Sequence, residues 1–410
     1  MDNLAIIIIM YAVIFFSMFL ALFWLFALYL SEPLLHSIVK KKFLPSVSII
    51  IPAYNEEKYI GATLKSILAL DYPKGKLEII VVANACTDKT VEIVRKFKQV
   101  RLIETPLPGK ARAQNLGLKY AKNEFVAVVD ADMHTKPDAL LRLMPHMEDK
   151  NVAQVIPAVK AAKPENLWQK LQYYEYVGAA LYKQLCSGMS LLFVVPGAFD
   201  VYRKSIIQKL GGFDEHTLTE DIEIATRLQK YGYTVKSDLD VEVFVPVPDN
   251  LIKFHKQRLR WSRGLLEVIA KHKDMLFNSK YGLLGEFMLP VTIILPFLIL
   301  PVYAIFFTII AGKIQTLFLL LSNIGLPTIS RNLASLKTYL LSLDALIWFS
   351  TVFFIMCGLY ILSKANTHLK TSFKYPGSLV VFFMVYPIIL SIYWILSIAA
   401  HFTKVKRIWR

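Results

Sequence analysis

The sequence predicts an α/β domain, with a mostly parallel sheet and helices on both faces, joined to an α-helical transmembrane region. Within residues 45–282, short apolar runs alternate with helical patterns, which is typical of parallel strands buried on both faces. Longer apolar runs lie on both sides, and about 20 apolar residues suffice to cross a bilayer. We therefore expect an N-terminal transmembrane anchor (1–44), a cytosolic domain with interfacial helices (45–282) and C-terminal transmembrane helices (283–410).

The composition supports a globular domain joined to membrane spans, and it argues against a nucleic-acid-binding function. The chain of 410 residues is 55% hydrophobic, yet it carries 47 Lys and Arg against 31 Asp and Glu, a net charge of +16. Basic residues cluster beside apolar runs, at Lys40–Lys42, Lys271, Lys273 and Lys404–Arg410, where they fit membrane flanks and anionic lipid headgroups. No basic-aromatic nucleic-acid motif is present, so nucleic acid is not an expected partner.

The first apolar run, Leu4–Leu30, is expected to be a retained anchor. No basic segment precedes it and no small-residue cleavage site follows it, which argues against a signal peptide. The basic cluster Lys40–Lys42 follows the run, so the next domain is expected in the cytosol. Three widely separated cysteines form no metal-type pair and are expected as reduced thiols, which suits that compartment: Cys86, Cys186 and Cys357.

Four apolar runs are expected to form the parallel part of the sheet: Val47–Ile51, Leu77–Val82, Val100–Glu104 and Phe125–Val129. Helical patterns separate them at Ile60–Leu68 and Val91–Phe97, and Gly109–Asn115 opens a third helix. Polar clusters follow the carboxyl ends of these strands, which is the edge where ligands bind in open α/β sheets. The sequence therefore predicts a binding site at this edge.

The segment Asp130-Ala131-Asp132, directly after the fourth strand, is the candidate metal site. Two carboxylates at this spacing can present hard oxygens to Mg²⁺ or Mn²⁺, which also bind substrate phosphates. The alternative is an Asp-initiated turn without a metal.

Two further stretches are expected beside the site. Asn166–Leu185 has helical spacing and many aromatic residues, so it is either an ordinary packed helix or an amphipathic helix on the membrane surface. Phe193–Phe199 is expected as a strand that enters a tight turn at Pro196–Gly197, where glycine would allow the backbone to approach a ligand closely.

Asp221 is the candidate catalytic base. It follows Glu220 at the start of an apolar helical pattern, where a carboxylate could face a cleft and accept a hydroxyl proton. Downstream, Gln257–Trp261 supplies two guanidinium groups, an amide and an indole, which suit a diphosphate and a sugar ring. Alone, the acid could be a helix cap and the basic run a membrane-topology signal. Their occurrence together and in order favours a sugar-nucleotide site.

Three C-terminal runs are expected to span the membrane: Leu283–Ala311, Tyr339–Leu362 and Leu379–Ala400. Three crossings after a cytosolic domain would leave the basic end Lys404–Arg410 outside, against the positive-inside rule. The shorter apolar run Leu317–Ile329 could be a re-entrant piece, an interfacial helix or a weak span. Counting it as a crossing returns the basic end to the cytosol.

The chain resembles the membrane-embedded family 2 glycosyltransferases, an inverting group with an A-type nucleotide-sugar-binding domain. This family includes cellulose, chitin, hyaluronan and poly-N-acetylglucosamine synthases and ceramide glucosyltransferases. The layout of the apolar segments is most similar to that of bacterial poly-N-acetylglucosamine synthases. The resemblance covers nearly the whole chain and rests on an ordered motif set: Pro52–Glu56, Thr87–Asp88, Gly109–Lys110, Asp130–Asp132, Thr219–Asp221, and Gln257, Arg260 and Trp261.

The resemblance implies roles for these residues. Asp221 would be the general base for the acceptor hydroxyl, within the motif that includes Glu220. Asp130 and Asp132 would hold the donor and a Mg²⁺ or Mn²⁺ ion. The remaining implied contacts are Ala53, Tyr54 and Glu56 beside the nucleoside, Asp88 near the base, Lys110 near the diphosphate, Gln257, Arg260 and Trp261 at the diphosphate and the acceptor end, and Gly197 beside the acceptor sugar.

One position departs from the family pattern. The family usually has an acidic pair, of which one acid contacts uracil, where this chain has Ala83–Asn84. The Asn84 amide can still hydrogen-bond a base, since it both donates and accepts. Selectivity for a UDP-sugar, of the UDP-GlcNAc or UDP-glucose type, is therefore less firmly implied than the rest.

The implied function is metal-dependent, inverting transfer from a nucleotide sugar to an acceptor hydroxyl. A processive polysaccharide synthase that moves its product across the membrane is the first hypothesis. A non-processive enzyme that adds one sugar to a membrane lipid is the alternative, and a small membrane subunit remains open as a partner. A transporter with a sugar-binding domain is the third, although few ionisable residues lie in the spans, among them Glu286 and Asp344.

Overall fold

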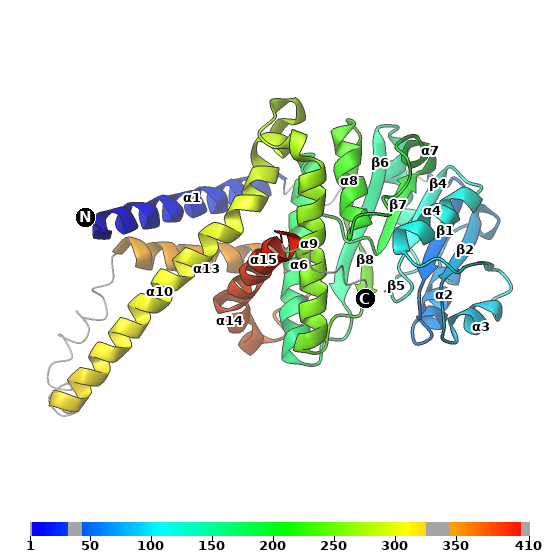
Figure 1. Cartoon of the computed structure of the whole chain (residues 1–410). Helices are drawn as coiled ribbons and strands as arrows, with labels where there is room; N and C mark the ends of the chain where they lie inside the picture. Colours follow the sequence, from blue (N-terminus) through cyan, green and yellow to red (C-terminus); the bar gives the residue numbers. More distant parts are fainter. Residues whose placement is uncertain (1, 32–42, 325–344, 403–410) are drawn as a thin grey trace.

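The computed structural model describes residues 2–31, 43–324 and 345–402. The basic clusters Lys40–Lys42 and Lys404–Arg410, and Asp344, lie outside the described residues. A sheet domain stands at one end of the molecule, and the long apolar helices α1 (Asp2–Ser31), α10 (Leu289–Ile324) and α13 (Ala345–His368) extend from the other, with further helices between them (Figure 1). The α/β domain joined to a helical apolar region is therefore confirmed.

The sheet has eight strands, and its first half is parallel as predicted. The order across the sheet is β3-β2-β1-β4-β7-β6-β8-β5. Strands β3, β2, β1 and β4 run parallel, β7 is antiparallel to both neighbours, and β5 is antiparallel to β8. The strand bounds are β1 Val47–Ala53, β2 Leu77–Asn84, β3 Arg101–Thr105, β4 Phe125–Val129, β5 His134–Thr135, β6 Val152–Ala161, β7 Phe199–Arg203 and β8 Thr234–Val245.

The strand expected at Phe193–Phe199 is wrong. The chain has no regular structure at residues 191–197, and strand β7 begins only at Phe199. Pro196 lacks a backbone N–H for a strand ladder, and Gly197 has φ +63°, which turns the chain out of an extended path. The apolar side chains of this segment are nevertheless buried, because the irregular loop crosses the core of the domain.

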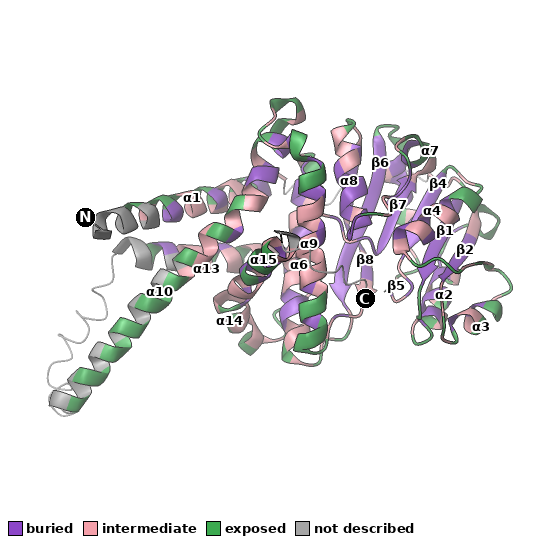
Figure 2. Cartoon of the chain, viewed as in Figure 1, coloured by how far each residue is buried: buried purple, intermediate pink, exposed green. Residues whose placement is uncertain are grey.

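Helices cover both faces of the sheet, and each face has its own apolar core. In Figure 2 strands β1, β4, β6 and β7 are almost wholly buried, while the helices around them are buried in part. The helices of this domain are α2 Ile60–Leu68, α3 Thr90–Arg95, α4 Lys110–Tyr120, α5 Ala139–Leu143, α6 Leu167–Gly188, α7 Lys204–Lys209, α8 Glu220–Lys230 and α9 Leu251–Lys271, with 3-10 turns at Lys74–Lys76, Met144–Glu148, Lys273–Met275 and Ser279–Tyr281.

Helix α6 is a packed helix, as the first of its two alternatives predicted. It contacts strands β6 and β8 on one side and α13 (Ala345–His368) and α14 (Pro376–Met384) on the other. Tyr173 and Tyr174 are 6% and 0% exposed, so these rings lie inside protein. The helix begins with a capping box in which Asn166 and Gln169 satisfy each other's backbone N–H groups.

The remaining helices are apolar. They are α1 (Asp2–Ser31), a π-helical turn (Leu284–Met288) that leads into α10 (Leu289–Ile324), and α15 (Tyr386–Phe402), together with α13 and α14. Within the described residues, Tyr11–Ser31 and Leu284–Pro301 are long and apolar enough to cross a membrane, and a third candidate is the pair α14–α15, bent by 44°. Of the short apolar run Leu317–Ile329, residues 317–324 form the end of α10 rather than a separate helix. Residues 325–329 lie outside the described part of the chain.

Candidate functional site

The loops that follow β1 and β2 are joined by hydrogen bonds at the carboxyl edge of the sheet. Asn55, at φ +53°, accepts a hydrogen bond from the Thr87 N–H at 2.8 Å. Asp88 accepts from the N–H groups of Glu57 and Thr90, both at 3.0 Å. Burial would raise the pKa of the Asp88 carboxyl, but these hydrogen bonds outweigh it and lower the pKa. The two loops therefore form one preorganised unit.

The residues expected at the nucleoside lie in this unit. Tyr54 is 42% exposed, whereas Ala53 and Glu56 are buried beneath it. Asn84 ends β2 and is 3% exposed, and among the described residues its Oδ1 atom has no hydrogen-bond partner. A buried acceptor without a partner costs stability unless a ligand or water satisfies it.

Lys110 forms ion pairs with two acidic side chains and lies near a third. It is the first residue of α4, and its Nζ atom lies 2.7 Å from Asp130 Oδ1 and 3.3 Å from Glu220 Oε1. Burial would lower the pKa of the Lys110 ammonium, but the carboxylates of Asp130, Glu220 and Asp221 outweigh it and raise the pKa. The structure thus brings the residue that follows β4 close to the start of α8, about 90 residues later in the sequence.

Asp221 lies in the first turn of α8, where the helix N-terminus favours a negative charge. Its Oδ1 atom accepts a hydrogen bond from the N–H of Ile222 at 2.9 Å. The dense surroundings raise the pKa of Asp221 to about 6, because burial and then the charge of Glu220 disfavour ionisation while Lys110 and Arg260 favour it. A carboxyl with this pKa is ionised near neutral pH and can still accept a proton, as a general base requires.

Gly197 fixes the position of the Asp221 carboxylate. A Cβ atom on Gly197 would lie 2.6 Å from Oδ2 and 3.0 Å from Cβ of Asp221, so any other residue here would force the Asp221 side chain or the loop to shift. The left-handed conformation of Gly197, at φ +63°, also favours glycine. The sequence-based expectation placed this glycine beside a ligand; in the structure its backbone packs against the proposed base.

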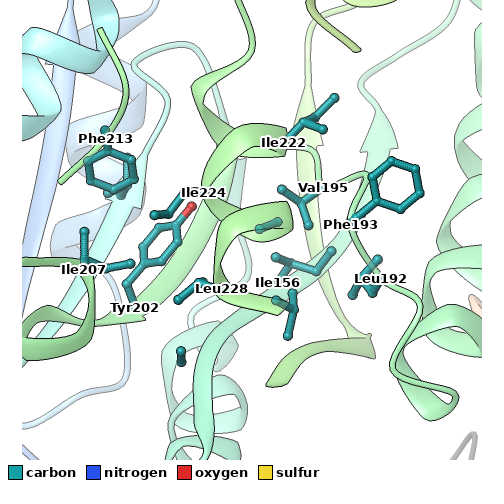
Figure 3. Close-up of a cluster of buried hydrophobic side chains, with 14 of the residues drawn as sticks. Ile156, Leu192, Phe193, Val195, Tyr202, Ile207, Phe213, Ile222, Ile224 and Leu228 are labelled. Carbon is teal, nitrogen blue, oxygen red and sulfur yellow. The ribbon is translucent and has the colours of Figure 1, made fainter. Parts of the chain in front are cut away.

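The body of α8 is held by the core shown in Figure 3, where Ile222, Ile224 and Leu228 point toward side chains from the sheet and the Phe193 loop. Its buried Glu223 receives hydrogen bonds from Lys271 at 2.7 Å and from Arg227 at 2.8 Å. The Lys271 contact joins α8 to the end of α9, and the Arg227 contact lies within α8 itself.

The motif residues Gln257, Arg260 and Trp261 lie on α9, which packs against α8. A Cβ atom on Gly264 would lie 2.4 Å from Thr219 Cγ2, so this glycine permits the close approach of α9 to the residue that precedes α8. Arg260 is near enough to lower the pKa of Asp221. The helix therefore brings the Arg260 guanidinium close to the acids, whereas the Trp261 ring lies against Arg258.

Asp130 and Asp132 would supply two of the ligands of a divalent cation, and a bound substrate would supply the others. Both side chains are partly exposed at the end of β4, and carboxylate oxygens are the donors that Mg²⁺ and Mn²⁺ prefer. Within the described residues, no group of three or more His, Cys, Asp or Glu could hold a metal ion by itself. Phosphate oxygens of a bound donor would therefore have to supply further coordination.

The sequence reading missed Asp200, which the fold places beside the proposed base. Its side chain is 0% exposed, and its Oδ2 atom accepts hydrogen bonds from Gln154 Nε2 at 2.8 Å and the Tyr202 hydroxyl at 3.2 Å. Burial and then the charge of Asp221 raise the pKa of Asp200 to about 7. The only signal in the sequence was a single acid inside the apolar run that follows Gly197.

Comparisons with known proteins relate most of the sheet domain to glycosyltransferases. Residues 48–211 match the model of the family described as Glycosyl transferase family 2. The probable glycosyltransferase YdaM of Bacillus subtilis is 31% identical over 255 residues, which are 58% of this chain and 60% of the relative. The poly-beta-1,6-N-acetyl-D-glucosamine synthase of Staphylococcus aureus (strain COL) is 28% identical over 276 residues, 63% of this chain and 66% of the relative. The aligned region thus spans less than two thirds of either relative.

A solved structure shares the whole fold. The mannosyltransferase PcManGT from Pyrobaculum calidifontis, in complex with GDP-Man and Mn²⁺, has a TM-score of 0.60 at 21% identity, and the match covers 98% of both chains. This likeness includes the apolar helices as well as the sheet. This likeness shows the fold alone, and the family match shows that residues 48–211 are similar to family 2 glycosyltransferases.

Proposed function

We propose that this chain is a membrane-embedded, inverting glycosyltransferase that transfers a sugar from a nucleotide sugar to an acceptor hydroxyl. The observation that carries the proposal is the position of Asp221, which packs on Gly197 and lies near enough to Lys110, the partner of Asp130, for the ammonium to affect its pKa. A candidate base and a candidate diphosphate-binding cation are thereby held close together. Transfer with inversion needs a single base and no covalent sugar intermediate, unlike the two carboxylates of most glycosidases.

The residues divide the reaction between them. Asp221 takes the proton of the acceptor hydroxyl, whose oxygen attacks the anomeric carbon as the bond to the nucleoside diphosphate breaks. Lys110 and Arg260 bind the departing diphosphate, since fixed cations are worth more in a partly desolvated site. A divalent cation held by Asp130 and Asp132 would offset further charge on the diphosphate. The nucleoside binds the paired loops at Tyr54, Glu56 and Asp88, and Asn84 contacts the base.

For the substrates, we propose a UDP-sugar of the UDP-GlcNAc or UDP-glucose type and a growing polysaccharide as the acceptor. The name of the Staphylococcus aureus relative, a poly-beta-1,6-N-acetyl-D-glucosamine synthase, supports this choice. We further propose that residues 283–410 cross the membrane several times, that residues 1–44 anchor the chain and that the domain 45–282 faces the cytosol, with the product passing between the apolar helices. Basic residues beside the apolar runs support this orientation.

The test is nucleoside diphosphate release by the purified protein in lipid nanodiscs, with a panel of UDP- and GDP-sugars and Mg²⁺ or Mn²⁺. The matched variant is Asp221→Asn, which keeps the size of the side chain but cannot accept the proton. We expect turnover of one donor, a loss of at least about 10²–10⁴-fold in Asp221→Asn, and unchanged nucleotide binding. Full activity in Asp221→Asn would refute the assigned base.

Product size separates the polysaccharide synthase from the alternative glycolipid enzyme. The same reactions, analysed on a gel, should give a ladder or a high polymer if transfer is processive. A single lipid-linked product would instead establish transfer of one sugar to a membrane lipid. If no donor were turned over or bound, the transporter hypothesis would gain over both enzymes.

A further inference from the structure

A buried ion pair joins the motif helix α9 to helix α6. Arg258 lies between Gln257 and Arg260, but it points away from solvent and is only 4% exposed. Its NH1 and NH2 atoms donate hydrogen bonds to both carboxylate oxygens of Glu175, at 2.5 and 2.6 Å. Paired bonds of this kind fix orientation as well as distance, because the guanidinium plane matches the carboxylate.

The same pair reaches the apolar helices. The hydroxyl of Tyr386 donates a hydrogen bond to Glu175 Oε2 at 2.7 Å. Tyr386 is the first residue of α15, directly after the break where α14 and α15 are bent by 44°. The bend of this candidate membrane span is therefore tied to α6 and, through Glu175, to Arg258.

Aromatic rings complete the contact between α9 and the apolar helices. The Arg258 guanidinium lies 4.6 Å from the centroid of the Trp261 ring and 4.8 Å from that of Phe254. The Phe254 ring is 0% exposed and lies 6.0 Å from the rings of both Tyr386 and Tyr393. Arg258 is thus in direct contact with the Trp261 ring.

We propose that Arg258, Glu175 and Tyr386, the α9 junction, are positioning residues that hold Arg260 and Trp261 against the diphosphate and the acceptor, and that couple this motif to the bend between α14 and α15. The inference rests on the proposed function. One helical turn of α9 carries both Arg258 and the motif, and removing one partner of a buried ion pair leaves an uncompensated buried charge that destabilises the fold. A loosened junction would let the motif move relative to the acids on β4 and α8.

The test compares two nucleotides that differ by one phosphate. The nucleoside loops bind both, whereas only the diphosphate reaches Arg260. Calorimetry with the wild-type protein in nanodiscs gives the ratio of the dissociation constants for the nucleoside monophosphate and diphosphate, with the uridine and guanosine forms both used. The variants are Glu175→Gln, Tyr386→Phe and Arg258→Lys, which keep size and ring packing while removing charge, hydroxyl or fork geometry.

The matched control is Lys160→Met. Lys160 also joins the sheet to an apolar helix, because its buried Nζ atom bonds Glu242 at 2.5 Å and the Leu369 carbonyl at 2.7 Å, but it lies away from α9. It should lower thermal stability like the junction variants and leave the nucleotide ratio unchanged. A general loosening of the fold would therefore appear in both sets.

We expect each junction variant to lower the preference for diphosphate over monophosphate about tenfold, the effect of one charge-assisted hydrogen bond, with monophosphate affinity within about twofold of wild type. Turnover should fall and the acceptor KM rise in parallel. An unchanged ratio in all three variants, or an equal change in Lys160→Met, would overturn the inference. Failure of the wild-type protein to bind either nucleotide would overturn the proposed function and this inference together.

Discussion

Replacing Gly197 by alanine tests the assignment of Asp221 at the level of a single methyl group. The new Cβ atom would lie 2.6 Å from Asp221 Oδ2, which is 0.8 Å shorter than 3.4 Å, the lower end of ordinary van der Waals contact. The body of α8 is buried in the core, so the strain would be relieved by rotation of the Asp221 side chain or by withdrawal of the 191–197 loop. Either movement displaces the proposed base.

The expected magnitude follows from that overlap. A misplacement of about 1 Å in a catalytic group can cost about 10²-fold in rate, or about 2.7 kcal/mol of transition-state stabilisation. A non-glycine residue at φ +63° costs a further ~1–2 kcal/mol of folding stability. We therefore expect Gly197→Ala to remain folded, with a modestly lower Tm and at least about 10²-fold lower kcat.

The assay is nucleoside diphosphate release at saturating donor, beside thermal unfolding of the same samples. Gly232→Ala is the matched control, because Gly232 also has a left-handed backbone at φ +81° but has no atom within 4 Å of the added Cβ. It should show the backbone strain without the loss of rate. Equal turnover in the two variants would refute the role of the Gly197–Asp221 contact.

Three further predictions follow from the surroundings of the base. Turnover needs ionised Asp221, whose pKa is raised to about 6, so kcat/KM should rise as the pH increases through that value. Glu220→Gln should move the midpoint of this rise to lower pH, and Lys110→Gln should move it to higher pH. A shift in the same direction for both variants would contradict the electrostatic assignment. Gly264→Ala should lower both Tm and turnover, because the new Cβ atom would lie 2.4 Å from Thr219. Without that overlap, alanine in a helix interior ordinarily stabilises a protein by about 1 kcal/mol relative to glycine. Gly75→Ala is the control, since a Cβ atom there has no neighbour within 4 Å. Chelation should abolish turnover and added Mn²⁺ restore it, and Asp132→Asn should raise the Mn²⁺ concentration needed for half-maximal rate; activity that persists in excess chelator would exclude the metal.

The sequence by itself determined the parallel half of the sheet and the order of the motifs. The runs at Val47–Ile51, Leu77–Val82 and Phe125–Val129 are apolar except for Ser48 and Glu78, a pattern that favours strands buried on both faces. The sequence also placed Asp221 at the start of a helix, because apolar residues begin to recur with the helical period of 3.6 directly after it. These features are local, so they can be read from a window of about ten residues.

Only the tertiary structure decided the second half of the sheet and the partners of the site. Strand β8 alternates buried and partly exposed residues and pairs with β6 across about 80 residues, and the irregular Phe193 loop replaces an expected strand because Gly197 must turn against Asp221. The buried Asp200 and the Arg258–Glu175 pair have no local signature. Their positions depend on which helices and strands pack together in the fold. The sequence gives the type of each side chain, but it does not show which distant side chains will become its neighbours.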